Sequence, residues 1–204
     1  MTKRSEQKQE ARARILDAGA AHVRGDGLDG AGIAAIMRDA GLTHGTFYAH
    51  FTDKADLAEA SFRHALTRGR AAWTRGEDQS WRGRLARLAR RYLTPKHRDH
   101  REEGCAFAAL GADAARAPAE FRRAFGEELQ RSIDAVCAAP EDGPVPERRR
   151  DDAILLLSLC VGGMTLARGV GDRALSDRIL RVCRSAMARE TGPLLSSGGN
   201  DNDQ

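Results

Sequence analysis

The side chains with the greatest capacity for specific contacts lie between residues 41 and 54, in the stretch GLTHGTFYAHFTDK. This stretch holds two histidines, several threonines, a tyrosine and a lysine, and almost no aliphatic residues. A buried helix would be more apolar, and an ordinary solvated helix would carry glutamate and lysine instead. The composition therefore predicts a surface that forms hydrogen bonds with a partner.

Helical spacing sorts these side chains onto two faces. Phe47 and Phe51 lie one turn apart, so both can anchor the segment to neighbouring helices. The opposite face then carries small and polar residues, which let a helix enter the major groove of DNA and reach the edges of bases. The residues expected to face the bases are His44, Gly45, Thr46 and Ala49, and those expected to contact phosphates are Tyr48, His50 and Lys54.

A short helix is expected before this segment, over residues 33–40, with apolar residues on one side. Gly41 permits the positive φ that ends a helix. Thr43 is a suitable N-cap for the next helix, which should run to about His50. Thr43 is also expected to be one of the DNA-binding residues. Helix, glycine turn and second helix form a helix-turn-helix pattern. The alternative is a surface helix that packs through Phe47 and Phe51 and has no further role.

No group of residues has the spacing of a catalytic or metal site. Ser-His-Asp sets, paired carboxylates and phosphate loops are not recognisable in the sequence. GDGLDG at 25–30 matches Gly-x-Gly-x-x-Gly, but it follows a helix rather than a strand and predicts a turn. His44 and His50 have no cysteine or carboxylate partner at ligand spacing. We therefore expect no catalytic residues, no metal and no cofactor, although an enzyme and a purely structural interaction protein remain competing classes.

The cysteines and the hydropathy pattern indicate a reduced, cytoplasmic protein. Cysteines at 105, 137, 160 and 183 never form Cys-x-x-Cys, which excludes the usual zinc motifs. The N-terminus is polar and does not resemble a signal peptide. The most apolar run, AILLLSLCVGGM at 153–164, is too short to span a bilayer. RGRLARLARRYL at 82–93 could lie on a membrane surface, but core packing through its leucines is the simpler interpretation, and no membrane partner is expected.

Cys105 is the one cysteine with a physical reason to be reactive. It follows Gly104 at the first turn of an expected helix, where free N–H groups stabilise a thiolate. Glu102 and Glu103 oppose a thiolate, and the apolar CAFAAL pattern suits an ordinary buried thiol. Redox or electrophile sensing therefore stays open beside the binding of an uncharged or anionic organic effector. Candidate lining residues for such a pocket are Trp73, Phe107 and Phe121.

The 204 residues are rich in Ala, Leu and Arg, with few β-branched residues and no sustained alternation, so we expect an all-α chain of about nine helices. The net charge is +4, and residues 1–56 carry eight basic and eight acidic side chains, so charge alone does not indicate nucleic-acid binding. The expected helices cover about 10–24, 33–40, 43–50, 54–74, 81–93, 105–115, 118–138, 148–168 and 176–189.

The sequence AGLTHGTFYAHFTDKADL resembles the signature of the TetR family of bacterial transcriptional regulators. The motif covers about residues 10 to 60, and the order of the helices extends the likeness over most of the chain. The resemblance implies an N-terminal helix-turn-helix domain (1–56), an effector-binding and dimerisation domain (57–190) and a disordered tail (191–204). It implies a homodimer that binds double-stranded operator DNA, usually as a repressor, and responds to a small organic effector. The family's base-facing and phosphate-contacting positions fall on the residues given above.

Two features depart from the family pattern. Helix 33–40 commonly starts after Thr or Ser, whereas this chain has Ala31 and Gly32, which removes an N-cap contributing about 1 kcal/mol. The N-terminal domain is also charge-neutral, so attraction to DNA must come from local placement, such as a mobile arm carrying Lys3, Arg4 and Lys8.

The last two helices are expected to form the dimer. DDAILLLSLCVGGMTLARGV at 151–170 shows an apolar stripe, and Gly162 and Gly163 would let two helices approach closely. The alternative is a helix buried within its own subunit, because burial alone gives the same pattern. The predicted interface residues are Leu157, Val161, Met164, Leu166, Ile179 and Val182.

Overall fold

The computed structural model describes residues 3–30, 32–76, 80–138 and 147–188, apart from the side chains at 72 and 73. These residues form helices and no strand, which confirms the all-α class. The tail expected from 191 lies outside the described residues, as does all but the last residue of APEDGPVPE (139–147), which joins the helices expected over 118–138 and 148–168. In chain order the elements are α1 (Lys3–Gly30), α2 (Ile33–Asp39), the 3-10 helix η1 (His44–Ala49), α3 (Lys54–Trp73), α4 (Trp81–Tyr92), α5 (Pro95–Asp99), α6 (Ala106–Arg116), α7 (Ala119–Cys137), α8 (Glu147–Gly169) and α9 (Arg173–Ala188).

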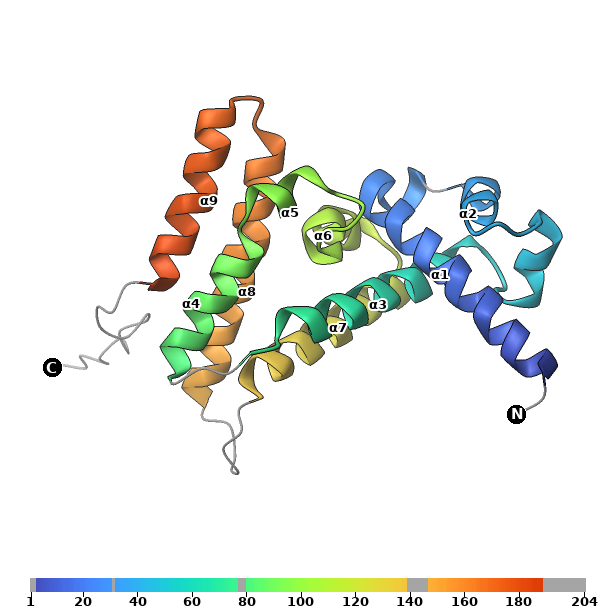
Figure 1. Ribbon diagram of the computed structural model, residues 1–204, viewed down its shortest axis with the longest axis horizontal. Helices are drawn as coiled ribbons and strands as arrows, with labels where there is room; N and C mark the ends of the chain where they lie inside the picture. Colours follow the sequence, from blue (N-terminus) through green and yellow to red (C-terminus); the bar gives the residue numbers. More distant parts are fainter. Residues whose placement is uncertain (1–2, 31, 77–79, 139–146, 189–204) are drawn as a thin grey trace, which may run out of the picture.

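Helices α1 and α2 lie at one end of the molecule and α4, α8 and α9 at the other, with α3, α6 and α7 between them (Figure 1). Each region has its own cluster of buried side chains. The first surrounds the helix-turn-helix, the second joins α1, α3, α6 and α7, and the third joins α4, α7, α8 and α9. α3 begins at Lys54, so the domain boundary expected after residue 56 falls inside the first turn of a continuous helix.

The first helix is longer than the sequence indicated. α1 begins at Lys3 rather than near Glu10, so the basic N-terminal segment is helical and the prediction of a mobile arm is wrong. The break expected after Arg24 falls at Gly27, which has φ of 80°, and the helix ends at Gly30. A Cβ on Gly27 would also lie 3.0 Å from Oδ2 of Asp113 on α6. Glycine suits both the backbone conformation and the close contact.

The helix-turn-helix is present, but its second element is a 3-10 helix rather than the expected α-helix. Gly41 has φ of 65°, as predicted for the turn. Thr43 precedes η1 but forms no capping hydrogen bond, because its Oγ1 pairs with Oγ1 of Thr46 at 2.9 Å. The backbone N–H of Thr46 donates to the Thr43 carbonyl at 3.0 Å, the i to i+3 pattern of a 3-10 helix.

α1 crosses α3 where Gly19 meets Ser61. Both residues are buried, and a Cβ on Gly19 would overlap the Ser61 hydroxyl oxygen. The absence of a side chain at Gly19 therefore lets the two helix backbones come close together. α1 therefore lies with α2 on one side of it and α6 on the other (Figure 1).

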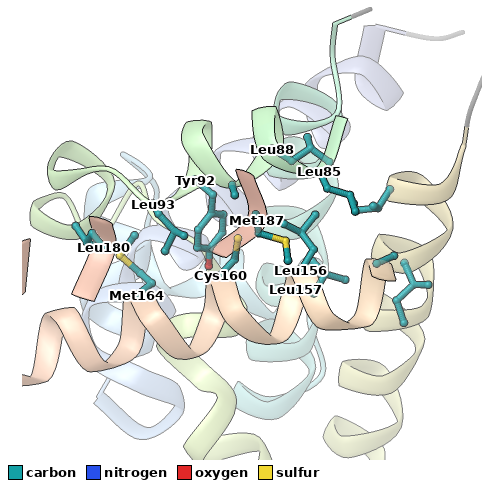
Figure 2. Packing of buried hydrophobic residues seen from close by; sticks show 14 of the residues in the cluster. Leu85, Leu88, Tyr92, Leu93, Leu156, Leu157, Cys160, Met164, Leu180 and Met187 are labelled. Atoms are coloured by element: carbon teal, nitrogen blue, oxygen red, sulfur yellow. The ribbon is translucent and has the colours of Figure 1, made fainter. Parts of the chain in front are cut away.

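The far end of the molecule is a three-helix layer of α4, α8 and α9. Leu85, Leu88 and Leu93 are at most 1% exposed, so this helix packs in the core as the leucine spacing indicated. Figure 2 shows these leucines facing side chains of α8 and α9 such as Cys160 and Met187. α8 is long and apolar enough to cross a membrane by length and composition alone, but core helices pass the same test, and α8 buries seven residues in this layer.

Two further helix starts differ from the prediction. The charged segment after Leu93, expected to be a loop, contains α5, which Thr94 caps by accepting from the His97 N–H at 3.1 Å. α9 begins at Arg173 rather than Ser176, because the Asp172 carboxylate accepts from the Ala174 N–H at 2.9 Å. Ser176 is buried inside the helix, where its hydroxyl donates to the Ala167 carbonyl at 2.6 Å.

A buried carboxylate joins α3 to α7. Glu128 is 1% exposed, and Nη2 of Arg70 donates to its Oε2 at 2.9 Å. Arg63 donates to its Oε1 at 3.4 Å, and Arg131 contacts the same oxygen. Nη1 of Arg70 also donates to the Ser132 hydroxyl at 3.1 Å. A carboxylate this well enclosed is stable only because three guanidinium groups surround it.

We predict that Glu128→Gln will lower the free energy of unfolding by about 3 kcal/mol, because removing one partner from a buried ion pair leaves the other charge uncompensated. Glu127→Gln is the matched control. Glu127 is the adjacent residue and also accepts from Arg63, at 2.8 Å, but its carboxylate is exposed. Urea denaturation followed by circular dichroism should show a clear loss for the first variant and almost none for the second. Equal losses would contradict this account of the α3–α7 contact.

Candidate nucleic-acid interface and ligand cavity

Two phenylalanines hold η1 in place. Phe47 is 0% exposed and Phe51 is 3% exposed, and their ring centroids lie 5.9 Å apart in a stacked arrangement. They pack with apolar side chains of α1, α2 and α3, which are Ile15, Ile36, Met37, Ala40 and Leu57. The inward face predicted from the sequence is therefore confirmed, and it fixes which side of η1 meets solvent.

The outward face of η1 is open. His44, Gly45, Tyr48 and Ala49 are exposed, with Tyr48 at 67%, and Thr46 is half-buried. The Tyr48 ring packs edge-on against His44 and Phe47, with centroids 6.1 and 5.0 Å away. A Cβ on Gly45 would meet nothing within 4 Å, so internal packing does not require a glycine at this position. The structure brings the predicted base-facing residues together on one surface.

His50 and Lys54, the other two residues predicted to contact phosphates, lie in different environments. His50 is half-buried, and its Nδ1 has no hydrogen-bond partner. Burial, followed by the charges of Lys8 and Arg12, lowers the pKa of His50, so the ring is neutral at pH 7. Nζ of Lys54 donates to the Asp29 carbonyl at 2.7 Å, which ties the start of α3 to the end of α1. An ammonium has three donors, so Lys54 can still reach a phosphate.

Two basic residues of α1 that the sequence analysis did not place here lie close to η1. The Arg12 guanidinium sits 4.7 Å from the Phe51 ring centroid, and Nη2 of Arg14 donates to the Gly41 carbonyl at 3.0 Å. Arg12 lies near enough to His50 to lower its pKa, as does Lys8 one turn earlier. The four-residue spacing of Lys8 and Arg12 was a signal for a basic helix face, but Lys8 was expected to lie in a mobile arm before the helix that contains Arg12.

A cavity of about 260 Å³ lies between α3, α4, α6 and α8. Its apolar walls come from Ala65, Leu66, Ala106, Phe107, Leu157 and Val161. Its polar groups come from Arg70, Arg91, Tyr92, His97, Glu103, Cys105 and Ser132. This mixture of apolar walls with a few convergent polar groups is typical of sites for small organic molecules.

Only some of the predicted pocket residues line this cavity. Cys105 and Phe107 line it. Phe121 does not, because it packs inside the second core cluster with its ring centroid 5.2 Å from that of Phe62. The side chain of Trp73 lies outside the described residues.

His97 is held in its neutral form beside the start of α6. Its Nδ1 lies 2.7 Å from the Tyr92 carbonyl, to which it can only donate, and its Nε2 accepts from the Cys105 N–H at 2.9 Å. Burial, partly opposed by the bond to the Tyr92 carbonyl, lowers the pKa of His97, which favours this neutral form. Burial, and then the adjacent Cys105 thiol, raise the pKa of Tyr92, so its hydroxyl stays protonated. Cys105 itself is half-buried and forms no disulfide.

Residues 15–61 match the family model of bacterial regulatory proteins, tetR family. This N-terminal segment has the sequence pattern of TetR-family regulators. The matched segment includes α2, η1, most of α1 and the first part of α3, so the helix-turn-helix described above is the part that carries the family's sequence pattern. No curated protein matches the sequence.

Solved structures of TetR-family regulators share the fold over most of both chains. E. coli NemR in its reduced form is 17% identical, covers 87% of this chain and 94% of its own, and has a TM-score of 0.68. A TetR-family regulator from Cytophaga hutchinsonii is 18% identical over 89% and 95% of the two chains, with a TM-score of 0.67. FadR from Bacillus subtilis, solved with stearoyl-CoA, is 18% identical over 85% and 97%, with a TM-score of 0.56.

The start of α2 differs from the TetR pattern, as the sequence indicated. Gly32 is the N-cap residue and forms no side-chain capping bond, and Ala31 lies outside the described residues. The helix keeps its first turn through backbone bonds alone, with the Ala35 and Ile36 N–H groups donating to the Gly32 carbonyl at 3.1 Å.

The six residues predicted for a TetR-type dimer interface do not share one surface. Leu157 and Met164 are 5% and 0% exposed and lie in the core of their own subunit, so they are removed from the predicted interface. Val161 is half-buried and lines the cavity, and Ile179 is half-buried against the core. Leu166 and Val182 are 62% and 55% exposed. α8 is apolar around most of its circumference, so its sequence did not reveal which side faces inward.

Proposed function

We propose that this TetR-family protein is a homodimeric repressor that binds a palindromic operator through η1 and releases it when a small organic molecule enters the cavity. The proposal rests above all on the open face of η1. That face is polar, it contains a glycine that internal packing does not require, and two buried phenylalanines fix its orientation. Such a surface suits close approach to base edges in the major groove.

The cavity is connected to the DNA-binding end through α6. Cys105 and Phe107 lie at the start of α6, and α6 packs against α1 through Ala106, Leu110 and Val23. Nε of Arg24 donates to the Glu102 carbonyl at 2.6 Å, just before α6, and Asp113 on α6 accepts from the Leu28 N–H at 3.4 Å. A ligand that moves the start of α6 therefore moves α1, and with it the spacing between two η1 segments in a dimer.

The size of the cavity favours a compact effector. FadR from Bacillus subtilis was solved with stearoyl-CoA, which is far larger than about 260 Å³ would hold. We infer a smaller uncharged or anionic organic molecule, enclosed by the apolar walls and oriented by the polar groups.

The decisive experiment is a fluorescence-anisotropy titration of the protein against duplex DNA from the region flanking its own gene, with random duplex as the reference. Specific, salt-dependent binding that a small molecule reverses would support the proposal. Binding to neither DNA would favour an enzyme or a structural interaction protein.

We predict that Lys54→Ala will weaken binding to operator and random DNA alike and will lower the salt slope by about 1, because it removes one phosphate contact. His44→Ala should instead weaken operator binding by about 1–3 kcal/mol and leave random DNA unaffected, as expected for a lost base contact. Anisotropy titrations at several salt concentrations measure both effects. Lys96→Ala, which removes an exposed lysine of α5 far from η1, is the control. An unchanged salt slope for Lys54→Ala would remove that residue from the DNA interface.

The exposed apolar residues of α8 and α9 support a dimer at the end of the molecule away from η1. Ile154 and Leu166 on α8 are 47% and 62% exposed, and Leu175 and Val182 on α9 are 44% and 55% exposed. Isolated apolar side chains are common on surfaces, but four large ones on two adjacent helices suit a self-complementary interface.

We predict that Leu166→Arg will give folded monomers that no longer bind operator, because a charge would be buried where two copies meet. Sedimentation velocity and circular dichroism will report mass and folding. Leu157→Arg should instead destabilise the subunit, because that residue is in the core. Ala115→Arg adds the same charge to an exposed position of α6 and should leave the dimer intact. A dimeric Leu166→Arg protein would place the interface elsewhere.

The position of Cys105 in the cavity wall keeps a second, covalent mode of sensing open. We predict that, if this mode operates, a peroxide or a small electrophile will release operator from the wild-type protein but not from Cys105→Ser, since the thiol is the reacting group. Cys183→Ser is the matched control, because Cys183 is also half-buried but does not line the cavity. Equal behaviour of the wild type and Cys105→Ser in the anisotropy assay would leave only a non-covalent effector.

A further inference from the structure

His22 links two helices of the DNA-binding end. Its Nδ1 lies 3.0 Å from Oδ2 of Asp26, one turn later on α1, and its Nε2 lies 2.8 Å from Oδ2 of Asp39, the last residue of α2. The imidazole is largely enclosed, whereas both carboxylates are about half exposed. The bond to Asp39 therefore joins α1 to the C-terminal end of α2, and the bond to Asp26 holds the ring in the orientation that makes this possible.

Both bonds require the charged form of the ring. A carboxylate can only accept, so each ring nitrogen must carry a hydrogen to satisfy its partner, and only imidazolium carries both. A neutral ring keeps one bond and loses the other, or places a lone pair against a carboxylate. Burial lowers the pKa of His22, but the hydrogen bonds to Asp39 and then Asp26 outweigh it and raise the pKa overall. The bond to His22 likewise lowers the pKa of Asp39.

The other charged groups around His22 favour the same state. A hollow of about 530 Å³ next to it is lined by Asp17, Asp26 and Arg14 of α1, by Asp39 of α2 and by Glu102 from the loop before α6. Arg38 donates to the second oxygen of Asp39 at 3.2 Å, and Arg14 is bound to the Gly41 carbonyl. Asp17 is bound by His64 and Arg68 of α3. Acidic groups outnumber the basic ones facing the ring, so protonation relieves repulsion.

We infer that His22 is a positioning residue for DNA binding, which in its protonated form clamps α2 against α1 and makes operator affinity depend on pH. The inference rests on the proposed function, because it assumes that α2 and η1 engage DNA as a unit. When α2 is held in the binding position, a larger fraction of molecules can bind DNA. When α2 is loosened, that fraction falls, and the apparent affinity falls by the same factor.

The direction of the effect follows from the raised pKa. The clamp is complete below the pKa of an unfolded-state histidine, about 6.5, and is lost as the pH rises through the higher folded-state value. His50 titrates below the ordinary range and faces the DNA side, so its own effect falls in a lower pH window. His44, which is exposed on η1, is present in every variant, so differences between variants isolate His22.

The test compares the wild type with His22→Gln, Asp39→Asn and Asp26→Asn from pH 6 to 9. The two aspartate variants form a matched pair, because each removes one negative charge beside the same ring, but only Asp39→Asn removes the charge that pairs with His22 between the two helices. Two measurements need no DNA: the NMR titration of the His22 Cε1–H signal, assigned by its loss in His22→Gln, and amide protection factors of α2. The third is operator affinity by anisotropy.

We expect a wild-type His22 signal that titrates above the range of an exposed histidine, and a fall in α2 protection and operator affinity of roughly three- to tenfold over the same pH range, the size of one typical hydrogen bond. In Asp39→Asn and His22→Gln, α2 protection and operator affinity should stay at their high-pH values over the whole pH range. Asp26→Asn should keep the pH-dependent fall in both, but at lower pH. Identical behaviour of the two aspartate variants, or α2 protection that does not follow the His22 titration, would overturn the inference. If the wild type binds no operator at any pH, the proposed function fails, and the two DNA-free measurements still decide whether the clamp exists.

Discussion

The crossing of α1 over α3 at Gly19 and Ser61 fixes the position of the helix-turn-helix relative to α6. The inward face of α1 is shared between two core clusters, because Ile15 packs with the helix-turn-helix while Ala20 and Val23 pack with α3 and α6. These residues lie on one unbroken stretch of helix, and the φ value outside the helical range comes only later, at Gly27. A shift of α6 would therefore be passed to the helix-turn-helix as a movement of a rigid rod, and η1 would follow through the contacts of its two phenylalanines.

The internal bonds of the cavity wall limit what it can recognise. The terminal nitrogens of Arg70 are used by Glu128 and Ser132, so its charge is already balanced inside the protein. Both nitrogens of His97 are used by backbone groups, which leaves the ring without a free donor. Discrimination among ligands would then depend mainly on the shape of the apolar walls, with Glu103 and Cys105 as the polar lining groups just before α6. That is also the position from which α6 is most easily displaced.

Sequence reasoning succeeded where a local pattern determines the outcome. The spacing of Phe47 and Phe51 determines which side of η1 faces inward, and the spacing of the leucines of α4 determines which side of that helix is buried. It failed where burial depends on partners far along the chain. Phe107 and Phe121 occupy similar apolar positions, yet only Phe107 lines the cavity, and Leu157 and Leu166 lie on one apolar helix but face opposite environments. α5 was missed although Thr94 and Pro95 are ordinary helix-start signals, because the charges that follow them suggested a loop.

The charge balance of the N-terminal domain also has a spatial explanation. Eight basic and eight acidic side chains cancel over residues 1–56, but they do not lie together. Asp17, Asp26 and Asp39 line the hollow between α1 and α2, where they pair with histidines and with Arg38 and Arg68. Lys8 and Arg12 lie beside His50 at the edge of η1, close enough to lower the pKa of that histidine. Attraction to a phosphate backbone depends on the charges within about one Debye length of it. The domain can therefore present a basic edge to DNA while its acidic residues hold its helices together, and the zero sum over its sequence conceals this separation.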